Sequence, residues 1–538
     1  MTTLISERKR PKAYPALQES KVLRYPLPVV PPQESLSILK NLFRQYDIRG
    51  VVADHSLDLN HFTWPEEVSL SAPLAYAIGC AYAAELRETH GKGEELSVAV
   101  AYDARLTGPE LTDALEQGLR CLGINVIHLG LVPTPVVYFA TYALAPDLLD
   151  EDGSPPECIC HGGIMVTGSH NPSAWNGFKL SFGRESVYGA QLQRLYHRIA
   201  HADYTIKGVD STAHITHKWT LDLSDKYLDE LHRRVQFSAR PLSDLKVVID
   251  AGHGASGPLA VRFFEELGVQ LKTLYCTPDG HFPAHHPDPT VEANLADLKE
   301  EVLAWGADVG LGFDGDGDRL GVVDGKGTVL WGDQLLLLFA QAILAHTPGE
   351  KIIGEVKCSQ VLYDGVKEAG GVAEMWQVGH SLIKARMKAC SAPLAGEMSG
   401  HLFFADRFYG FDDAIYAGAR LLERLTELDF NLSTWRENLP EMINTPELRV
   451  YCADQDKLSV INRFSAAFAK DYEVNTIDGA RVMFDQGWGL VRASNTQPVL
   501  VMRFEASSHE LLDRYRSKVE EWLKEHTPEV RFDIDPNH

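Results

Sequence analysis

Three aspartates, Asp314, Asp316 and Asp318, alternate with glycines directly after the apolar run DVGLGF. Side chains at alternate positions of an extended loop face one way, and the intervening glycines let the backbone bend around a small ion. Three carboxylates without Cys or His favour Mg²⁺ over Mn²⁺ or Ca²⁺. An EF-hand loop needs Gly at its sixth position and Glu at its twelfth, where this chain has Arg319 and Gly325. The pattern therefore predicts a magnesium site, with a solvated acidic turn as the alternative.

A single serine stands in a second polar turn, TGSHNP, where Ser169 follows an apolar run that ends at Val166. A glycine before the serine and a proline after it favour a sharp exposed turn that lifts the hydroxyl off the end of a strand. Such a hydroxyl could act as a nucleophile or carry a phosphate. A helix N-cap or an Asx turn is the alternative. The elbow of an α/β-hydrolase is excluded, because Asn171 stands where that turn needs Gly.

Two further loops are rich in hydrogen-bonding groups. In GEMSGH, the alternate residues Glu397, Ser399 and His401 could converge on sugar hydroxyls, and a structural turn is the alternative. In RASNTQP, a guanidinium, two hydroxyls and an amide suit the oxygens of a phosphate dianion, and a polar connection between two strands is the alternative. The donors of this last region are Arg492, Ser494, Asn495, Thr496 and, in the apolar run that follows, Arg503.

The composition limits the classes of partner. The chain has 538 residues, 45% of them apolar, and a formal net charge of −23. This length predicts about three to four domains. The negative field repels phosphate backbones and anionic lipid, so we expect no nucleic acid and no membrane surface as a partner, and a small anionic substrate needs a local basic pocket. Scattered cysteines, short apolar runs and an N-terminus without a signal core predict a cytoplasmic protein.

Strand-like and helix-like patterns alternate after about residue 40, and they must position these loops. Such alternation implies βαβ crossovers and mostly parallel sheets, so the predicted fold class is α/β. The predicted strands cover 96–102, 125–129, 246–250, 308–313, 351–356 and 372–378, and the predicted helices cover 71–86, 108–121 and 259–267. The Pro-rich segment 1–38 resists helix and sheet, which predicts an extended arm or tail, and the acidic segment 145–163 predicts an inserted surface loop.

The four loops, in this order and at these separations, resemble those of the α-D-phosphohexomutase family, in particular its bacterial phosphomannomutase/phosphoglucomutase branch. The resemblance runs from the motif YDIRG at 46–50 to Ala506. It implies four domains around a central cleft, namely three related α/β domains and a smaller α+β C-terminal domain. The expected units are an N-terminal extension at 1–38, then 39–205 with the serine loop, 206–332 with the metal loop, 333–442 with the sugar loop and 443–538 with the phosphate loop.

The resemblance also implies an activity and a role for each loop. It implies that Ser169 carries a phosphate and that Asp314, Asp316, Asp318 and an oxygen of that phosphate hold one Mg²⁺ per chain. The sugar phosphate binds the RASNTQP loop while the phosphoserine donates to the other end of the sugar. A hexose 1,6-bisphosphate then turns around and returns one phosphate, so that hexose 1-phosphate and hexose 6-phosphate of mannose or glucose interconvert.

Other site residues come from the same resemblance. The implied catalytic residues besides Ser169 are Arg49, Lys179, Arg319 and His380, and the implied substrate contacts are Arg319, Lys357, Gly379, Glu397, Ser399, His401, Arg492, Ser494, Asn495, Thr496 and Arg503. The base that takes the sugar hydroxyl proton stays open, because a lysine needs a lowered pKa for that role whereas a histidine titrates near neutrality.

Three other functions compete with this interpretation. A phosphoglucosamine mutase is the nearest, but its final loop usually reads RPSGTEP rather than RASNTQP. A metal-dependent sugar-phosphate-binding protein without turnover needs no phosphorylatable serine. A haloacid-dehalogenase-like phosphatase uses a D-x-D pattern followed by Gly-Thr, and here Asp316 is followed by Gly317 and Asp318, so that pattern fails.

Overall fold

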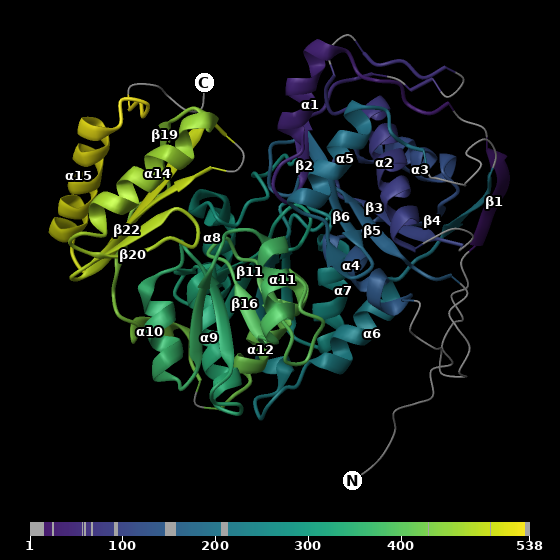
Figure 1. Ribbon diagram of the computed structural model, residues 1–538. Helices are drawn as coiled ribbons and strands as arrows, with labels where there is room; N and C mark the ends of the chain where they lie inside the picture. The colour runs from purple at the N-terminus through teal and green to yellow at the C-terminus, as the bar shows by residue number, and fades with distance from the viewer. Residues whose placement is uncertain are drawn as a thin grey trace.

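The computed structural model describes residues 16–23, 26–55, 57–58, 61–65, 68–90, 95–145, 158–205, 214–428, 430–494 and 497–532. The described chain forms four sheets that follow one another along the sequence, each with its own helices. Figure 1 shows the first sheet at the right, the second and third below the centre, and the fourth at the left. Within the described residues, the structure contains no helix that is long and apolar enough to cross a membrane.

The first sheet has the strand order β1-β8-β4-β3-β5-β6-β2, with β7 paired to β6. Its strands are β1 (Ala16–Leu23), β2 (Ile48–Val51), β3 (Ser97–Tyr102), β4 (Asn125–Leu131), β5 (Gly162–Val166), β6 (Trp175–Phe182), β7 (Glu185–Ser186) and β8 (His214–Thr220). The helices of this unit are α1 (Leu36–Leu42), α2 (Ala72–His90), α3 (Gly108–Cys121), α4 (Thr134–Ala143) and α5 (Ala190–Ala200). The predicted helix 108–121 is confirmed at both ends, and Pro109 in its first turn suits a helix start.

Two expectations about this unit are wrong. The segment 1–38 is not only an extended arm, because β1 pairs antiparallel with β8 at the edge of the sheet. The run 16–23 contains no proline, so its backbone can complete the hydrogen bonds that an edge strand leaves open. The segment 145–163 does not end as a surface loop, because Cys158 and Cys160 are buried and β5 begins at Gly162 between β3 and β6. Residues 146–157 of that segment lie outside the described residues.

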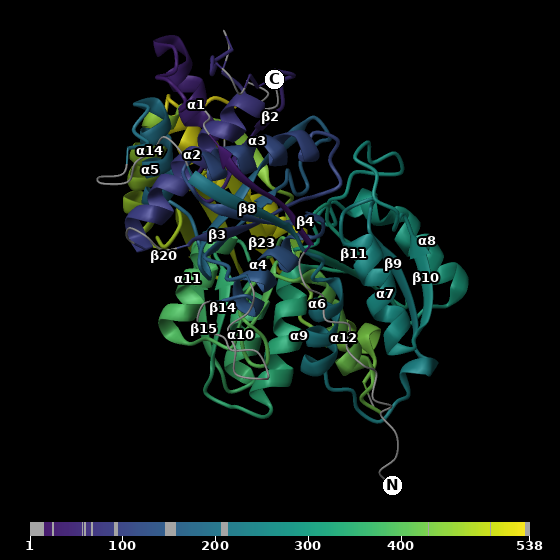
Figure 2. The same cartoon turned by 90° about the vertical axis from the view of Figure 1, so that its right-hand side faces the viewer.

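The second and third sheets share one design. The second has the order β10-β9-β11-β12-β13 and the third has the order β15-β14-β16-β17. The strands are β9 (Lys246–Asp250), β10 (Gln270–Leu274), β11 (Val309–Phe313), β12 (Leu320–Asp324), β13 (Val329–Leu330), β14 (Lys351–Glu355), β15 (Val372–Trp376), β16 (Leu394–Gly396) and β17 (Leu402–Phe404). The helices are α6 (Ser224–Arg234), α7 (Gly257–Leu267), α8 (Ala296–Trp305), α9 (Gly332–Leu344), α10 (Gln360–Glu368), α11 (His380–Cys390), α12 (Ala414–Leu425) and α13 (Leu432–Glu437). Figure 2 shows α7 and α8 beside the strands of the second sheet.

The fourth sheet is antiparallel throughout, with the order β18-β23-β22-β21-β20 and β19 paired to β23. Its strands are β18 (Ile443–Asn444), β19 (Leu448–Tyr451), β20 (Glu473–Asn475), β21 (Ala480–Phe484), β22 (Gly487–Ala493) and β23 (Val499–Ala506), and its helices are α14 (Asp454–Phe468) and α15 (His509–His526). This unit has an apolar core of its own, whereas one core runs through parts of the first three units. The predicted class, three α/β domains and a smaller α+β domain, is confirmed.

The expectation of mostly parallel sheets is wrong in a way that matters for the site. Each sheet contains an antiparallel hairpin, formed by β5 with β6, β11 with β12, β16 with β17, and β22 with β23. The turns of these hairpins are the serine loop, the metal loop, the sugar loop and the phosphate loop. A run of apolar residues identifies a strand but not the direction of its neighbour. Each of the four loops is therefore the turn of an antiparallel hairpin.

Candidate active site

The serine loop and the metal loop meet at one buried contact. Ser169 Oγ donates a hydrogen bond to Asp314 Oδ2 at 2.9 Å. The Ser169 backbone has a φ of 49°, so the predicted sharp turn is present, but the predicted exposure is wrong because the side chain is wholly buried. The metal loop covers it: a Cβ added to Gly315 would lie 2.5 Å from the carbonyl oxygen of Ser169. Only glycine allows this approach of the two loops.

The three aspartates of the metal loop converge as their spacing predicts. One oxygen from each of Asp314, Asp316 and Asp318 lies within 4.8 Å of the others, and all three residues are buried. Burial, and then the charges of Asp316 and Asp318, raise the pKa of Asp314 well above its usual value. Among the described residues, Asp316 Oδ1 has no hydrogen-bond partner. A hard-oxygen set with an unpartnered buried oxygen and mutual repulsion fits a divalent cation.

Lys179 is the charge partner of this cluster. Its Nζ donates to Asp316 Oδ2 at 2.7 Å and to Asp318 Oδ2, and Thr134 Oγ1 also donates to Asp316 Oδ2, at 2.6 Å. Burial alone would lower the pKa of Lys179, but Asp316 and Asp318 outweigh burial and hold this pKa above its usual value. Lys179 is therefore cationic in this arrangement.

A cavity of ≈ 760 Å³ joins residues of all four units. Most of the residues predicted for the site line it: Arg49, Lys179, Arg319, Lys357, Gly379, His380, Glu397, Ser399, His401 and Arg503. Ser169 and the three aspartates are buried next to this cavity. His170, which follows Ser169, lines the cavity, and so does Lys179, which contacts Asp316 and Asp318. Arg492 and Ser494 are not among its lining residues, and Asn495 and Thr496 lie outside the described residues.

The sugar loop is bonded to the metal loop. His401 Nδ1 lies 2.6 Å from Glu397 Oε2, and its Nε2 lies 3.1 Å from Asp318 Oδ1. Gly379 N donates to Glu397 Oε1 at 2.7 Å, and Arg319 Nε lies 3.2 Å from His401 Nε2. The turn around 397–401 is thus placed by the second unit as well as by its own strands.

Arg49 and His380 meet at a carboxylate that the sequence reasoning did not select. Arg49 Nη2 donates to Asp47 Oδ2 at 2.9 Å, and His380 Nε2 lies 3.4 Å from Asp47 Oδ1. Burial raises the pKa of Asp47, but Arg49, His380 and Lys179 together outweigh burial, so this pKa lies well below its usual value. A signal was present, because Asp47 stands two residues before Arg49 in YDIRG.

Further cations of the cavity come from the third and fourth units. Arg503 lines the cavity, and two of its guanidinium nitrogens, Nε and Nη1, have no hydrogen-bond partner among the described residues. Lys357 Nζ donates to Glu447 Oε1 at 3.0 Å across the third and fourth units. Arg492 is buried and donates to Asp478 Oδ2 at 3.1 Å. Glu447 was missed by sequence reasoning, because no local pattern marks a partner ninety residues from Lys357.

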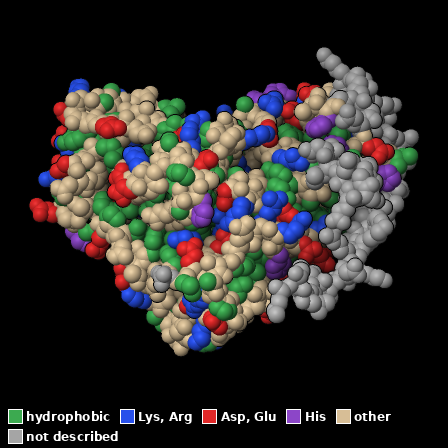
Figure 3. Space-filling model, turned by 90° about the horizontal axis from the view of Figure 1, so that it is seen from below, with side chains coloured by type: hydrophobic (Ala, Val, Ile, Leu, Met, Phe, Trp, Pro, Cys, Tyr) green, Lys and Arg blue, Asp and Glu red, His purple; other side chains and the backbone are tan. Residues whose placement is uncertain are grey.

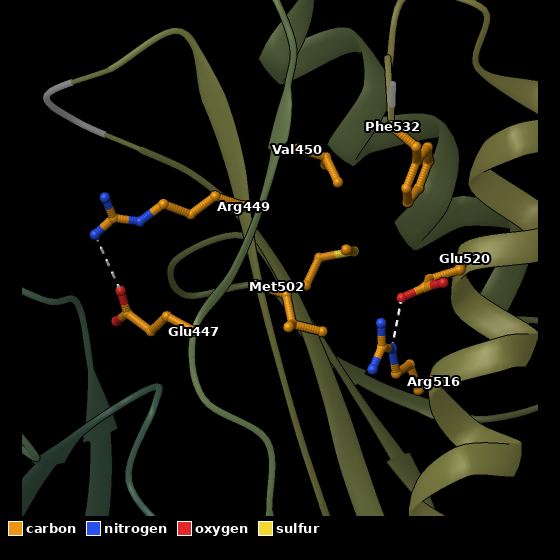
Figure 4. Close-up of a pocket in the computed structure, with 8 residues that line it drawn as sticks. Glu447, Arg449, Val450, Met502, Arg516, Glu520 and Phe532 are labelled. Carbon is orange, nitrogen blue, oxygen red and sulfur yellow. Dashed lines mark hydrogen bonds and ion pairs between the residues drawn. The ribbon is translucent and has the colours of Figure 1, made fainter. Parts of the chain in front are cut away.

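A second hollow of ≈ 520 Å³ lies on the fourth unit between β19, β23 and α15 (Figure 4). Its charged side chains are paired, Arg516 with Glu520 at 2.7 Å and Arg449 with Glu447 at 3.7 Å. None of the residues predicted for the site lines this hollow, so the chemistry belongs to the larger cavity.

Hairpin turns of the first three sheets meet the segment 444–449 and Arg503 of the fourth unit at one cleft. A buried serine, a carboxylate cluster and several cations at such a cleft are typical of a phosphotransferase. Four family models of phosphoglucomutase/phosphomannomutase match this chain in order. The alpha/beta/alpha domains I, II and III match residues 40–203, 225–327 and 331–443, and the C-terminal domain matches residues 447–521. The chain belongs to the phosphoglucomutase/phosphomannomutase family.

Individual relatives agree with this membership. A phosphomannomutase/phosphoglucomutase of Pseudomonas syringae pv. tomato is 42% identical over 490 residues, which cover 91% of this chain and 96% of that protein. A crystal structure of a phosphoglucomutase/phosphomannomutase family protein from Burkholderia thailandensis has a TM-score of 0.79 and 42% identity, and covers 91% of this chain and 98% of that chain. The fold of Aspergillus fumigatus N-acetylphosphoglucosamine mutase, solved with GlcNAc-6P and magnesium, is similar at a TM-score of 0.51 and 13% identity, over 82% of this chain and 80% of that chain. The predicted family and mutase activity are confirmed.

Proposed function

We propose that this mutase interconverts the 1-phosphate and the 6-phosphate of a hexose, mannose or glucose, through a phosphate carried by Ser169 and a hexose 1,6-bisphosphate. The observation that carries the proposal is the contact of Ser169 Oγ with Asp314 beside the large cavity. The names of the Pseudomonas and Burkholderia relatives, which pair phosphomannomutase with phosphoglucomutase, support both sugars.

Asp314, Asp316, Asp318 and a phosphate oxygen on Ser169 would hold one Mg²⁺ per chain. When bound, this ion supplies the positive charge that a phosphoserine beside three buried carboxylates requires. The unpartnered Asp316 Oδ1 and the all-oxygen donor set support this assignment. The magnesium in the Aspergillus enzyme of similar fold is consistent with it.

In the first transfer, the P–O bond to Ser169 Oγ breaks while a P–O bond to the sugar hydroxyl forms, and the hydroxyl proton passes to a base. Arg49, Lys179 and Arg319 stand around this point as cations that stabilise the charge on the moving phosphoryl group. Arg49 Nη1 donates to the Gly168 carbonyl at 3.1 Å. Lys179 contacts the metal loop, as described above, and Arg319 belongs to that loop.

The two candidate bases differ in charge. Burial and the nearby Lys384 lower the pKa of His380 below its ordinary value, against the opposing effect of Asp47. His380 is therefore neutral near pH 7 and can accept a proton. Lys179, with its raised pKa, suits the role of a fixed cation. His380 also lines the cavity, and we propose it as the proton acceptor.

The remaining cavity residues hold the substrate. Glu397 and Ser399 suit sugar hydroxyls, because one offers an acceptor and the other both a donor and an acceptor. Lys357, Gly379 and His401 are further substrate contacts, with Arg319 beside the metal loop. The phosphate distal to Ser169 is assigned to Arg492, Ser494, Asn495, Thr496 and Arg503. The cavity volume of ≈ 760 Å³ and the cations on both sides of it support a bisphosphate that turns around within the site.

Capture of the substrate rests on these local cations, since the whole chain has a net charge of −23. On the face shown in Figure 3, basic and acidic side chains are interspersed. We propose small sugar phosphates as partners, and the net charge of −23 argues against nucleic acid and membrane surfaces. We propose a location in the reducing cytoplasm, because the eight cysteines are scattered along the chain without the spacing of a disulfide framework.

The proposal is tested by mass and by turnover. Intact mass of the protein after incubation with glucose 1,6-bisphosphate should show one added phosphate, and peptide mapping should place it on Ser169. A coupled assay should show conversion of both glucose 1-phosphate and mannose 1-phosphate. Release of inorganic phosphate without an isomer would instead identify a phosphatase.

Arg503→Ala should raise the KM for sugar phosphates by about 10- to 100-fold, because a charge-assisted hydrogen bond contributes about 1.5–3 kcal/mol. We expect kcat to change less, since Arg503 faces the end of the substrate that does not react. Steady-state kinetics with glucose 1-phosphate measure the split, and Arg503→Lys, which keeps the charge, should recover part of the loss. An unchanged KM in Arg503→Ala would remove this residue from the site.

A further inference from the structure

Arg105 lies in the loop after β3 and contacts no residue assigned to substrate binding. Both of its terminal nitrogens donate hydrogen bonds to the serine loop. Its Nη1 donates to the carbonyls of Pro172 and Trp175 at 2.6 and 2.8 Å. Its Nη2 donates to the carbonyls of Ser169 and Asn171 at 2.7 and 2.5 Å. Four carbonyl oxygens between Ser169 and Trp175 thus converge on one guanidinium.

The fifth donor of the same guanidinium completes the arrangement. Arg105 Nε donates to Asp103 Oδ2 at 3.2 Å, so all five N–H groups of the side chain are used. Thr167 Oγ1 donates to the same Asp103 oxygen at 2.7 Å and accepts from Ser169 N at 2.7 Å. Asp103 and Arg105 therefore hold the serine loop from its first residue to its last.

The contact is also tight and enclosed. A Cβ added to Gly168 would lie 2.5 Å from Arg105 Cζ, and the guanidinium is wholly buried. The ring of Phe282, which follows β10 in the second unit, lies 5.3 Å from Arg105 Cζ. Ser169 has a positive φ, which a non-glycine residue adopts only where its surroundings hold it. Arg105 contacts this turn on one side, and the metal loop contacts it on another.

We propose that Arg105 is a positioning residue for phosphoryl transfer: by binding four carbonyls of the serine loop it holds the Ser169 hydroxyl against the metal loop. This inference rests on the proposed phosphate transfer through Ser169. Displacement of a reacting group by about 1 Å costs about 100-fold in rate. Loss of the guanidinium should therefore slow transfer to and from Ser169 while the binding of sugar phosphates in the cavity is kept.

Arg105→Lys is the direct test, because lysine keeps the charge but has three donors in place of five. We expect kcat to fall by about 10- to 100-fold with KM within about two-fold of the wild type. Arg87→Lys is the matched control, since Arg87 is a buried arginine of the same unit that donates to the carbonyls of Leu122 and Gly123, away from the serine loop. Both variants should lose thermal stability, but only Arg105→Lys should lose kcat.

Gly168→Ala is a second variant, for use if Arg105→Lys does not fold. The added methyl group would displace the Arg105 guanidinium from the serine loop. The second measurement is the rate at which dephosphorylated protein gains phosphate from glucose 1,6-bisphosphate, followed by intact mass. A wild type that gains no phosphate would overturn the proposed function and not this inference. A wild type that gains phosphate on Ser169, with Arg105→Lys and Gly168→Ala gaining it at the same rate, would overturn the role of Arg105.

Discussion

Ser169→Ala should lower kcat for the conversion of glucose 1-phosphate to glucose 6-phosphate by at least about 10⁴-fold, because no other group replaces a covalent phosphate carrier. The side chain is wholly buried, and its loss removes one hydroxyl and one hydrogen bond to Asp314. We therefore expect a folded protein that still binds glucose 1-phosphate with a Kd within a few-fold of the wild type.

The measurements are a coupled kinetic assay, isothermal titration calorimetry and phosphopeptide mapping. Ser433→Ala, which removes another buried serine hydroxyl, in α13, serves as the control and should keep full activity. If Ser169→Ala retained wild-type turnover, or if phosphate were found on a different residue of the active protein, the assignment of Ser169 would have to be abandoned.

Asp316→Asn should lower activity by more than about 100-fold at saturating Mg²⁺, since even groups one shell outside a metal cost about 10- to 100-fold. Asp316 lies in the middle of the aspartate cluster and binds Lys179 and Thr134. Asparagine keeps the shape of the side chain but removes one negative charge, and with it the attraction for the cation.

Asp324→Asn is the matched control, because Asp324 is a buried carboxylate on the same hairpin that accepts from the backbone of Lys326 and Thr328 instead. Thermal melting with added Mg²⁺ gives a readout that does not depend on turnover, because a bound ion stabilises the folded state. The melting temperature of the wild type and of Asp324→Asn should rise with Mg²⁺, and that of Asp316→Asn should not. Equal Mg²⁺ responses in all three proteins would contradict the metal assignment.

Local patterns predicted those features of the protein that depend on neighbours in the chain. The helix at 108–121 and the strand at 246–250 lie where periodicity and a Pro in the first turn place them. The aspartates at alternate positions converge because a short loop brings residues two apart onto one side. Sequence patterns failed for the strand β1 and for the antiparallel direction of β6, β12 and β17, since pairing direction depends on which strands meet in space.

The sequence by itself determined the chemical groups of this protein, their order along the chain and the family to which they belong. Only the tertiary structure decided that Ser169 is buried under the metal loop, that Asp47 joins Arg49 to His380, and that Arg105 binds the serine loop. Except for Asp47 and Arg49, which are close in sequence, the residues in these contacts are separated by 64 to 333 positions. Contacts over such distances arise from the packing of whole units, and burial within them sets the charge of each group. The local spacing of residues encodes neither these long-range contacts nor the charges of the buried groups.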